Sequence, residues 1–595
     1  MKNRKYLAAI AVFMTLSVAC NSTYLDKMPE AEGYTFETVF KDSTNYRDFV
    51  NYLIVNPAFL PLQNGTKPYG NLDDISDNSI SGSTFTTTPS VQAARGDFYI
   101  MRTNTDAVQC NNDTWAQIWK NIRVANTGIR NIEYYQGSEF SKVKILGMCY
   151  FFRAFYYMEL TRRWGGMPYL YAPLDADADF DLPRLSMQET YKLAAIDCDS
   201  AAMYLRDVIP PSEFQNPSRV GALALKSRCL LYAASDQART ENHISNPKEN
   251  LWEAAAIAAD EALKVAEENG YELVPYGNSL NGDDGYYYLF KDNQYETYMK
   301  EILHGRRAEI AWGSDAYINT CRPPGPLGGK YGIGVNQALV DCFEMQNTGL
   351  PIDDPESGYT AQDPYAGRDP RFYHDIMYNQ SKVFGNMTMQ IWQEEEGKGI
   401  TGSPDLLMTN QVPVMGYTQT GYYMRKWMGK TWNVSLPQLF SWIRLAEVYL
   451  NFAEAANEAW NDPTVRNGSC EYSAVEALNI VRNRAQMPNL NAKFLNKNGF
   501  RDRVRNERRV ELCFEEHRLF DIRRWLIGTQ PENRDIWRMK IVKLAAGYNS
   551  DVYPTGFQYT KELLIRRVFE NRQNLFAIKD DATQIGPNFT QNPGW

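Results

Sequence analysis

Three glutamates recur at the spacing of one helical face. Glu507, Glu511 and Glu515 are four residues apart, so a helix over this stretch places their carboxylates on one side. Paired carboxylates are what a glycosidase uses. Here the cations Arg508 and Arg518 alternate with them and would keep each carboxyl pKa low, whereas a general acid needs a raised pKa. We predict a partly buried ion-pair network that locks helices together, and no catalytic residue.

Other patterns of catalysis are absent from the sequence. The histidines show no HExxH or other metal-ligand spacing; they are His243, His304, His374 and His517. The glycine-rich stretch 328–334 lacks the Ser or Thr that must follow the lysine of a phosphate-binding loop, and no GxSxG nucleophile elbow occurs. The sequence therefore favours a binding protein over an enzyme and predicts no catalytic metal.

Two acidic stretches carry oxygen atoms of the kind that calcium prefers. They run from Asp73 to Asp77 and from Asn281 to Asp284. Neither follows the calcium loop of an EF-hand. Solvated turns are the simpler interpretation, and a structural Ca²⁺ is the alternative.

Two loop regions combine the residue types that bind sugars. A pyranose has a flat apolar face, which stacks on Trp or Tyr, and a rim of hydroxyls, which bonds with Asn, Asp or Arg. Such residues gather within 271–436 and around residue 78. We predict ligand contacts from Trp312, Tyr317, Arg322, Tyr287, Tyr331 and Asn78. For each aromatic residue, a place in the hydrophobic core is the alternative.

The first twenty residues indicate export and lipid attachment. A basic start, Lys2 to Lys5, precedes an apolar run that ends near Val18, which is typical of a signal peptide over residues 1–19. The segment Leu16–Cys20 resembles a lipobox, in which the cysteine receives the lipid. We expect Cys20 to become the lipidated first residue, because acyl chains anchor a protein stably. Cleavage after Ala19 with free secretion is the alternative.

The charge of the chain argues against nucleic acid as a partner. Removing residues 1–19 takes away three of the 62 basic residues and none of the 71 acidic ones, so the formal net charge falls from −9 to −12. An acidic surface repels phosphate backbones. The cysteines beyond Cys20 are scattered without CxxC spacing, and we expect mostly buried free thiols.

Helical periodicity occupies both ends of the chain, and irregular sequence occupies the middle. Apolar residues recur every three or four positions over about 114–132, 141–163, 186–206, 219–235, 249–268, 437–460, 473–485 and 500–517. The lengths and short connections suggest antiparallel pairs, as in tetratricopeptide solenoids. Strands are expected near 301–303 and 422–427, and loops over 61–105 and 546–595. The fold class is therefore mainly α, with tetratricopeptide-like helix pairs, an irregular loop-rich face and a few short strands.

Several motifs, taken in order, resemble the SusD/RagB family of nutrient-binding outer-membrane lipoproteins. They are Phe152–Tyr157 with Trp164–Pro168, Gly221–Arg228, Arg368–Phe372, Arg444–Leu450, Glu507–Trp525 and Gln591–Trp595. The block 507–525 is the most specific of them. The resemblance extends from the lipobox to the last residue. It implies one unit over 20–595, divided into an arm with helix pairs (20–270), a loop-rich ligand-binding region (271–436) and C-terminal helices and loops (437–595).

The resemblance also implies a function. Members of the family are non-catalytic proteins that present a glycan to a SusC-like TonB-dependent outer-membrane barrel. We therefore expect a lipid-anchored glycan-binding protein of the outer membrane that faces the cell exterior. A peptide-binding RagB-like protein is the alternative, and a surface glycosidase is a further one.

Overall fold

The structure is a computed structural model, and it describes most of the chain. The described residues are 36–55, 72–82, 88–103, 110–210, 213–241, 243–244, 248–277, 285–290, 300–307, 323–324, 327, 329, 332–383, 387–394, 403–406, 408–409, 412–414, 416–428 and 439–595. Within them, no helix is both long enough and apolar enough to cross a membrane.

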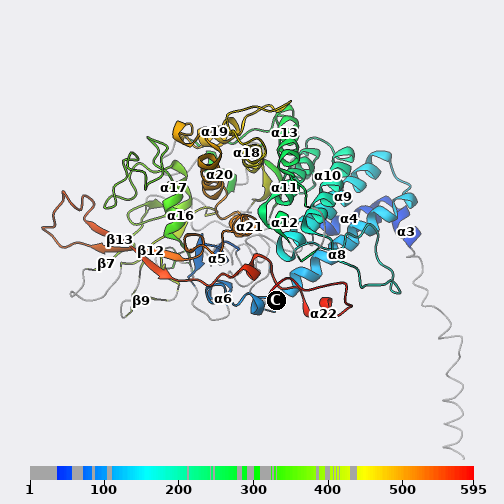
Figure 1. The fold of residues 1–595 in the computed structure, drawn as a ribbon, viewed down its shortest axis with the longest axis horizontal. Coiled ribbons are helices and arrows are strands. Elements are labelled where there is room, and N and C mark those ends of the chain that lie inside the picture. Colours follow the sequence, from blue (N-terminus) through cyan, green and yellow to red (C-terminus); the bar gives the residue numbers. More distant parts are fainter. Residues whose placement is uncertain are drawn as a thin grey trace, which may run out of the picture.

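A row of long helices forms one half of the molecule (Figure 1). Each helix packs on the next in chain order, up to α18. They are α8 (Asn112–Arg130), α9 (Glu139–Trp164), α10 (Met187–Tyr204), α11 (Arg219–Ala234), α13 (Trp252–Glu268) and α18 (Leu445–Trp460). The helices α3 (Phe36–Lys41) and α4 (Ser43–Val55) lie at the outer end of this row, and the short α12 (Asp236–Thr240) follows α11. The expected mainly α fold with successive helix pairs is confirmed.

Local sequence signals set the ends of these helices. The Ser186 hydroxyl accepts from the Glu189 amide at 3.2 Å, and the Glu189 carboxylate reaches back, which completes the predicted capping box of α10. The helix α9 ends at Trp164 because Gly165 adopts a φ of 83°, which glycine reaches without strain. Both helix ends lie where the sequence places them.

The rest of the fold consists of shorter helices and small strand pairs (Figure 1). The helices are α5 (Leu72–Ile75), α6 (Pro89–Arg95), α7 (Phe98–Met101), α16 (Gln337–Cys342), α17 (Pro370–Asp375), α19 (Ala474–Arg484), α20 (Lys497–Glu511), α21 (Arg518–Arg524) and α22 (Asp580–Thr583). Single 3₁₀ turns, labelled η, include η3 (Gly285–Phe290) and η7 (Asn571–Asn574).

All strand pairs of the described residues are antiparallel except one. They are β1 (Ser79–Ser81) with β3 (Ile333–Val335), β2 (Ile302–Arg307) with β11 (Leu439–Arg444), β4 (Ile376–Met377) with β10 (Tyr423–Met424), β5 (Lys382–Val383) with β6 (Met387–Thr388), and β8 (Met408–Thr409) with β9 (Val412–Pro413). The longest pair joins β12 (Ile536–Lys543) to β13 (Phe557–Ile565), and β7 (Gln393–Glu394) adds to β12 in parallel.

Three expectations about local structure are wrong. The stretch 439–444 is not helical, because β11 pairs with β2. The helix α20 ends at Glu511 rather than near 517, because Phe514 and Glu516 have positive φ angles. The supposed loops of 61–105 contain α5, α6 and α7. The tail 546–595 is mainly loops, as expected, although it also contains β13.

Two hydrophobic cores underlie the two halves. The helical core includes Leu450 and Val504, and the loop-side core includes Val510 and Phe514. The segment from α20 to the start of α21 thus contributes side chains to both cores. Trp442 packs against each of them. The two halves are therefore joined at this segment.

Buried charges concentrate at the same junction. The Glu511 carboxylate accepts hydrogen bonds from three guanidinium groups: Arg371 Nη1 at 2.8 Å, Arg444 Nη1 at 2.6 Å, and Arg484. All four side chains are at most 3 % exposed. Burial alone would raise the pKa of Glu511, but the three arginines outweigh it and hold the pKa well below its usual range.

Arg444 extends this network to two further carboxylates. Its Nε donates to Glu515 at 2.7 Å and its Nη1 to Glu301 at 2.8 Å. The Lys426 ammonium also donates to Glu515, at 2.9 Å. A neighbouring set follows the same pattern: Glu507 with Arg371 at 2.6 Å and with Arg482 at 3.1 Å. The predicted ion-pair network is confirmed, and it is fully rather than partly buried.

Replacing Arg444, the central cation of the buried network, should strongly lower the stability of the fold. Arg444→Met leaves Glu301, Glu511 and Glu515 without one partner each in a site where their side chains are at most 2 % exposed. We expect it to lower the free energy of unfolding by about 3–5 kcal/mol. Denaturant titration followed by circular dichroism measures this loss.

The matched control is Arg466→Met. Arg466 pairs with Glu476 at 2.6 Å, but the two side chains are 56 % and 41 % exposed. An exposed pair contributes at most about 1 kcal/mol. Equal losses of stability in the two variants would contradict a structural role for the buried network.

A buried histidine predicts sensitivity to acid. His304 on β2 packs against Phe151, Phe155 and Trp442, and within the described residues neither ring nitrogen has a hydrogen-bond partner. Burial, aided by Arg228, lowers the pKa of His304 to about 3. Because this folded-state value lies below the ordinary 6.5, His304 favours folding above pH 6.5, and that contribution is lost as the pH falls toward 3.

Replacing this histidine should remove the effect. In His304→Leu we expect the fall in unfolding free energy between pH 6.5 and pH 4.5 to shrink by roughly 2–3 kcal/mol. Denaturant titrations of wild type and variant at both pH values test this. If the variant keeps the pH dependence of the wild type, the imidazole of His304 has the same pKa in the folded and the unfolded states, which would contradict this account.

Candidate functional site

Most of the predicted ligand residues fall outside the described part of the chain. These are Trp312, Tyr317, Arg322 and Tyr331, together with the lipid-bearing Cys20. The backbone of Tyr287 belongs to η3, but its side chain is also outside. Their predicted contacts stay predictions.

Asn78 has an internal role instead of facing a ligand. Its side chain is fully buried; the amide nitrogen donates to Asp73 Oδ1 at 2.8 Å, and the amide oxygen accepts from Arg509 Nε at 3.0 Å. Because both ends of the amide are bound within the protein, the prediction that Asn78 contacts a ligand is wrong for this structure.

The acidic stretch around Asn78 is not a solvated turn. Asp73, Asp74 and Asp77 are at most 1 % exposed. Asp77 binds Arg518 Nε at 2.7 Å and Arg509 at 3.0 Å, so arginines supply the positive charge there. Burial raises the pKa of Asp73 to about 6 and that of Asp74 to about 7.

These acidic residues give no support to the alternative of a structural Ca²⁺. Across the described ranges, His, Cys, Asp and Glu form no group of three or more that could hold a metal ion. The other acidic stretch, Asn281 to Asp284, lies outside the described residues. The seven described cysteines are free, and five of them are buried: Cys110, Cys149, Cys198, Cys229 and Cys513.

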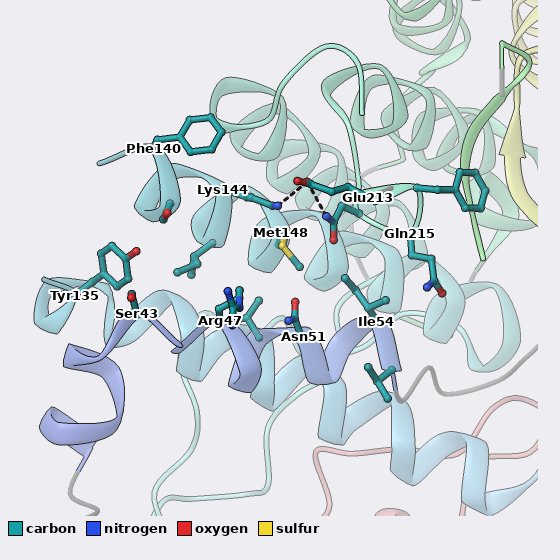
Figure 2. Close-up of a pocket in the computed structure, with 16 residues that line it drawn as sticks. Ser43, Arg47, Asn51, Ile54, Tyr135, Phe140, Lys144, Met148, Glu213 and Gln215 are labelled. Carbon is teal, nitrogen blue, oxygen red and sulfur yellow. Dashed lines mark hydrogen bonds and ion pairs between the residues drawn. The ribbon is translucent and has the colours of Figure 1, made fainter. Parts of the chain in front are cut away.

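A large cavity lies at the outer end of the helix row, between α4 and α9 (Figure 2). This α4–α9 pocket has a volume of about 920 Å³, within the size range of small-molecule sites. The helix α4 forms one wall and the start of α9 the other, and the segment 213–216 closes one end. Val50, Ile145 and Met148 line it and are buried in the helical core.

Two capped helix ends fix the walls of the pocket. Asp42 Oδ1 accepts from the amides of Thr44 and Asn45 at the start of α4, and the Ser138 hydroxyl accepts from the Ser141 amide at the start of α9. The end wall is fixed by Glu213, whose carboxylate binds Lys144 Nζ at 2.7 Å (Figure 2). That hydrogen bond lowers the pKa of Glu213.

Several polar groups of the pocket are free to bind a ligand. Among the described residues, the side-chain amides of Asn51 and Gln215 make no hydrogen bond, and the buried hydroxyl of Tyr135 has no partner. Arg47 is 63 % exposed and has only a long contact with Asp48, at 3.5 Å. Amides, a phenol and a guanidinium can each bond with hydroxyls.

An exposed aromatic ring borders these polar groups. Phe140, in the first turn of α9, is 59 % exposed and extends over the pocket (Figure 2). An exposed ring beside free amides is the combination that a pyranose needs. The pocket can therefore bind a sugar chain without reacting with it, since its carboxylate, Glu213, is already paired.

The ligand contacts predicted from the sequence did not include Phe140, Asn51 or Gln215. Phe140 falls outside the apolar stripe of α9, and that position was a usable signal for an exposed aromatic. Asn51 and Gln215 carried no signal, because they come from separate stretches of chain that meet only in the fold.

The α4–α9 pocket adjoins the region that the sequence predicts to bind sugar. Arg306, near the end of β2, donates to the carbonyl oxygens of Ile54 and Val55 at the end of α4. Ile54 and Val55 also line the pocket. The predicted residues Trp312 and Tyr317 follow β2 directly in the sequence.

Comparison with known proteins identifies the family. The family model described as "SusD family" matches residues 276–595, more than half of the chain. This chain belongs to the SusD family. A second model, described as "Starch-binding associating with outer membrane", matches residues 63–231. The two matches cover both halves of the fold.

Solved structures of SusD-like proteins have the same fold. A SusD-like protein from Bacteroides fragilis is 25 % identical with a TM-score of 0.70, covering 94 % of this chain and 98 % of its own. A SusD-like carbohydrate binding protein from the same species is 20 % identical with a TM-score of 0.69, covering 93 % and 100 %. The curated SusD-like protein P25 from Formosa agariphila is 22 % identical over 426 residues, 69 % of this chain and 70 % of its own.

Proposed function

We propose that this SusD family protein is a non-catalytic glycan-binding lipoprotein of the outer membrane. It captures an oligosaccharide on its surface and delivers it to a SusC-like TonB-dependent barrel. The observation that carries the proposal is the family match over 276–595, together with the fold shared over nearly the whole chain with a protein named as carbohydrate binding.

The α4–α9 pocket supports glycan binding. It offers an exposed ring, two free amides and an unpartnered phenol in one cavity of about 920 Å³. Peptide binding in an extended form would instead use backbone partners, such as a free strand edge. We infer that the pocket and the predicted contacts of Trp312, Tyr317, Arg322, Tyr287 and Tyr331 belong to one sugar-binding face.

The paired carboxylates support a binding role over catalysis. Glu511 is held ionised by three arginines, and Glu213 by Lys144. A glycosidase needs one carboxyl group that holds its proton near neutral pH. Neither glutamate has that environment, so the glycosidase alternative gains no support from them.

Attachment to the outer membrane rests on two observations. The lipobox-like segment ends at Cys20, and the family model over 63–231 is described as associating with the outer membrane. We infer that lipidated Cys20 tethers the protein and that the tether keeps it beside the barrel, facing the cell exterior.

The proposal predicts which exposed aromatic residue matters for sugar binding. Phe140→Ala should lower the affinity for the cognate glycan about fivefold, because a stacked ring contributes about 1 kcal/mol. Trp312→Ala should act in the same way. Isothermal titration against a glycan panel measures both effects.

Phe180→Ala is the matched control. Phe180 is also exposed, at 46 %, but it lies in another part of the surface and does not line the α4–α9 pocket. Its variant should bind the glycan like the wild type. Unchanged affinity in Phe140→Ala would remove the α4–α9 pocket from the binding face, and binding of peptides alone would overturn the glycan assignment.

Removing the lipid-bearing Cys20 should release the protein from the membrane. Cys20→Ala should abolish palmitate labelling, and the protein should leave the membrane fraction and no longer co-purify with a TonB-dependent barrel, because no acyl chain holds it there. Palmitate labelling and membrane fractionation test this, with Cys470→Ala as the control for a free thiol. A labelled Cys20→Ala protein, or a wild type without palmitate, would contradict the tether.

A further inference from the structure

A second cavity lies where the C-terminal segment crosses the helix row. It has a volume of about 540 Å³ and shares no residue with the α4–α9 pocket. Its polar lining includes Glu241 and His243 after α12, Asn574 of η7, and Asn592 near the C-terminus. We call it the C-terminal pocket.

A buried carboxylate oxygen in this pocket has no hydrogen bond. The Glu241 side chain is 3 % exposed; its Oε2 accepts from the Met187 amide at 2.8 Å, whereas its Oε1 is unpartnered within the described residues. The nearest nitrogen atoms of basic side chains lie farther away: Lys248 Nζ is 3.5 Å from Oε2, and His243 Nε2 is 3.6 Å from Oε1. Burial raises the pKa of Glu241.

Two amide oxygens are also free. Asn592 is 2 % exposed, and its nitrogen donates to the carbonyl oxygens of Trp164 at 2.9 Å and Phe576 at 2.8 Å. Those bonds fix the orientation of the amide, so Oδ1 is the free acceptor. Asn574 has the same pattern, since its nitrogen donates to the Asn571 carbonyl while its Oδ1 has no partner.

Unpartnered buried polar atoms are costly, which points to a bound partner. Three of the free atoms, Glu241 Oε1, Asn574 Oδ1 and Asn592 Oδ1, accept hydrogen bonds. His243 Nε2, which also lines the pocket and has no partner within the described residues, donates one when it carries the imidazole proton. A ligand that fits must therefore both donate and accept, as hydroxyl groups do.

The surrounding charge excludes an ionic ligand. Burial, aided by the nearby cations Arg184 and Lys248, lowers the pKa of the His243 imidazole to about 4, so the ring is neutral near pH 7. The same cations oppose a metal ion or an ammonium group. An anion would face the three acceptor oxygens. A neutral ligand meets neither repulsion.

We propose that the C-terminal pocket binds a neutral mono- or disaccharide. The sugar hydroxyls donate to Glu241, Asn574 and Asn592 and accept from His243 Nε2, while its apolar face packs on Leu526 and Leu575, which also line the pocket. The class of ligand rests on the proposed function, whereas the location is independent of the α4–α9 pocket. The protein would then hold sugar at two separate sites.

Saturation-transfer difference NMR on the full mature chain tests this proposal with glucose, galactose, mannose, maltose and cellobiose. Glu241→Gln replaces a free acceptor by a donor at equal volume. Thr240→Trp fills the pocket from an exposed position at the end of α12 and removes no bond of the lining oxygens. Glu249→Gln, an exposed glutamate paired with Lys192, is the matched control.

We expect at least one sugar to bind wild type, Phe140→Ala and Glu249→Gln alike, and to bind Glu241→Gln and Thr240→Trp at least tenfold more weakly. The proposal fails if no sugar of the panel binds, which would indicate a water-filled cavity only. It also fails if binding is unchanged in both pocket variants, or if Phe140→Ala alone abolishes it; in that last case the proposed function still stands. If long glycans do not bind but the small sugars do, the proposed function fails while this site holds.

Discussion

The charge network around Glu511 is the constraint on which the rest of the structure depends. Arg371 comes from α17, Arg444 from the end of β11, and Arg484 from the end of α19, and all three reach one carboxylate of α20. A buried carboxylate is tolerated only with its partners in place. The network therefore stabilises the packing of these four elements, which joins the helix row to the loop-rich half.

The same network gives a physical reason for the sequence motifs of the family. Arg371 lies in the motif 368–372, Arg444 begins the motif 444–450, and Glu507, Glu511 and Glu515 form the start of the block 507–525. These residues look like candidates for chemistry when the sequence is viewed alone. In the fold they hold the scaffold together, and the residues that we propose as sugar contacts lie elsewhere.

The scaffold in turn makes binding without reaction possible. The α4–α9 pocket is built on two capped helices whose inner faces lie in the helical core, so Phe140 and Asn51 are held by rigid elements rather than by loops alone. Preorganised groups lose little freedom when a ligand binds. The outcome is a surface that can hold a sugar chain while its charged groups are already neutralised by partners.

Local signals were predictable from the sequence, and long-range pairings were not. The capping box at Ser186 and the stop at Gly165 act through neighbouring residues, so α9 and α10 were placed correctly. By contrast, β11 exists because it pairs with β2, far earlier in the chain. Asn78 looked like a loop residue because its partner Arg509 is distant in sequence.

The candidate site follows the same rule. Its residue types were foreseen for the loops of 271–436, but the pocket of Asn51, Phe140 and Gln215 arises only when separate stretches fold together.

The most direct test of the central claim is to incubate the purified mature protein with its glycan and then analyse both the bound amount and the chain length. The account predicts saturable binding with every sugar chain recovered intact. Shortened chains that accumulate with time, and more slowly in Phe140→Ala, would contradict it.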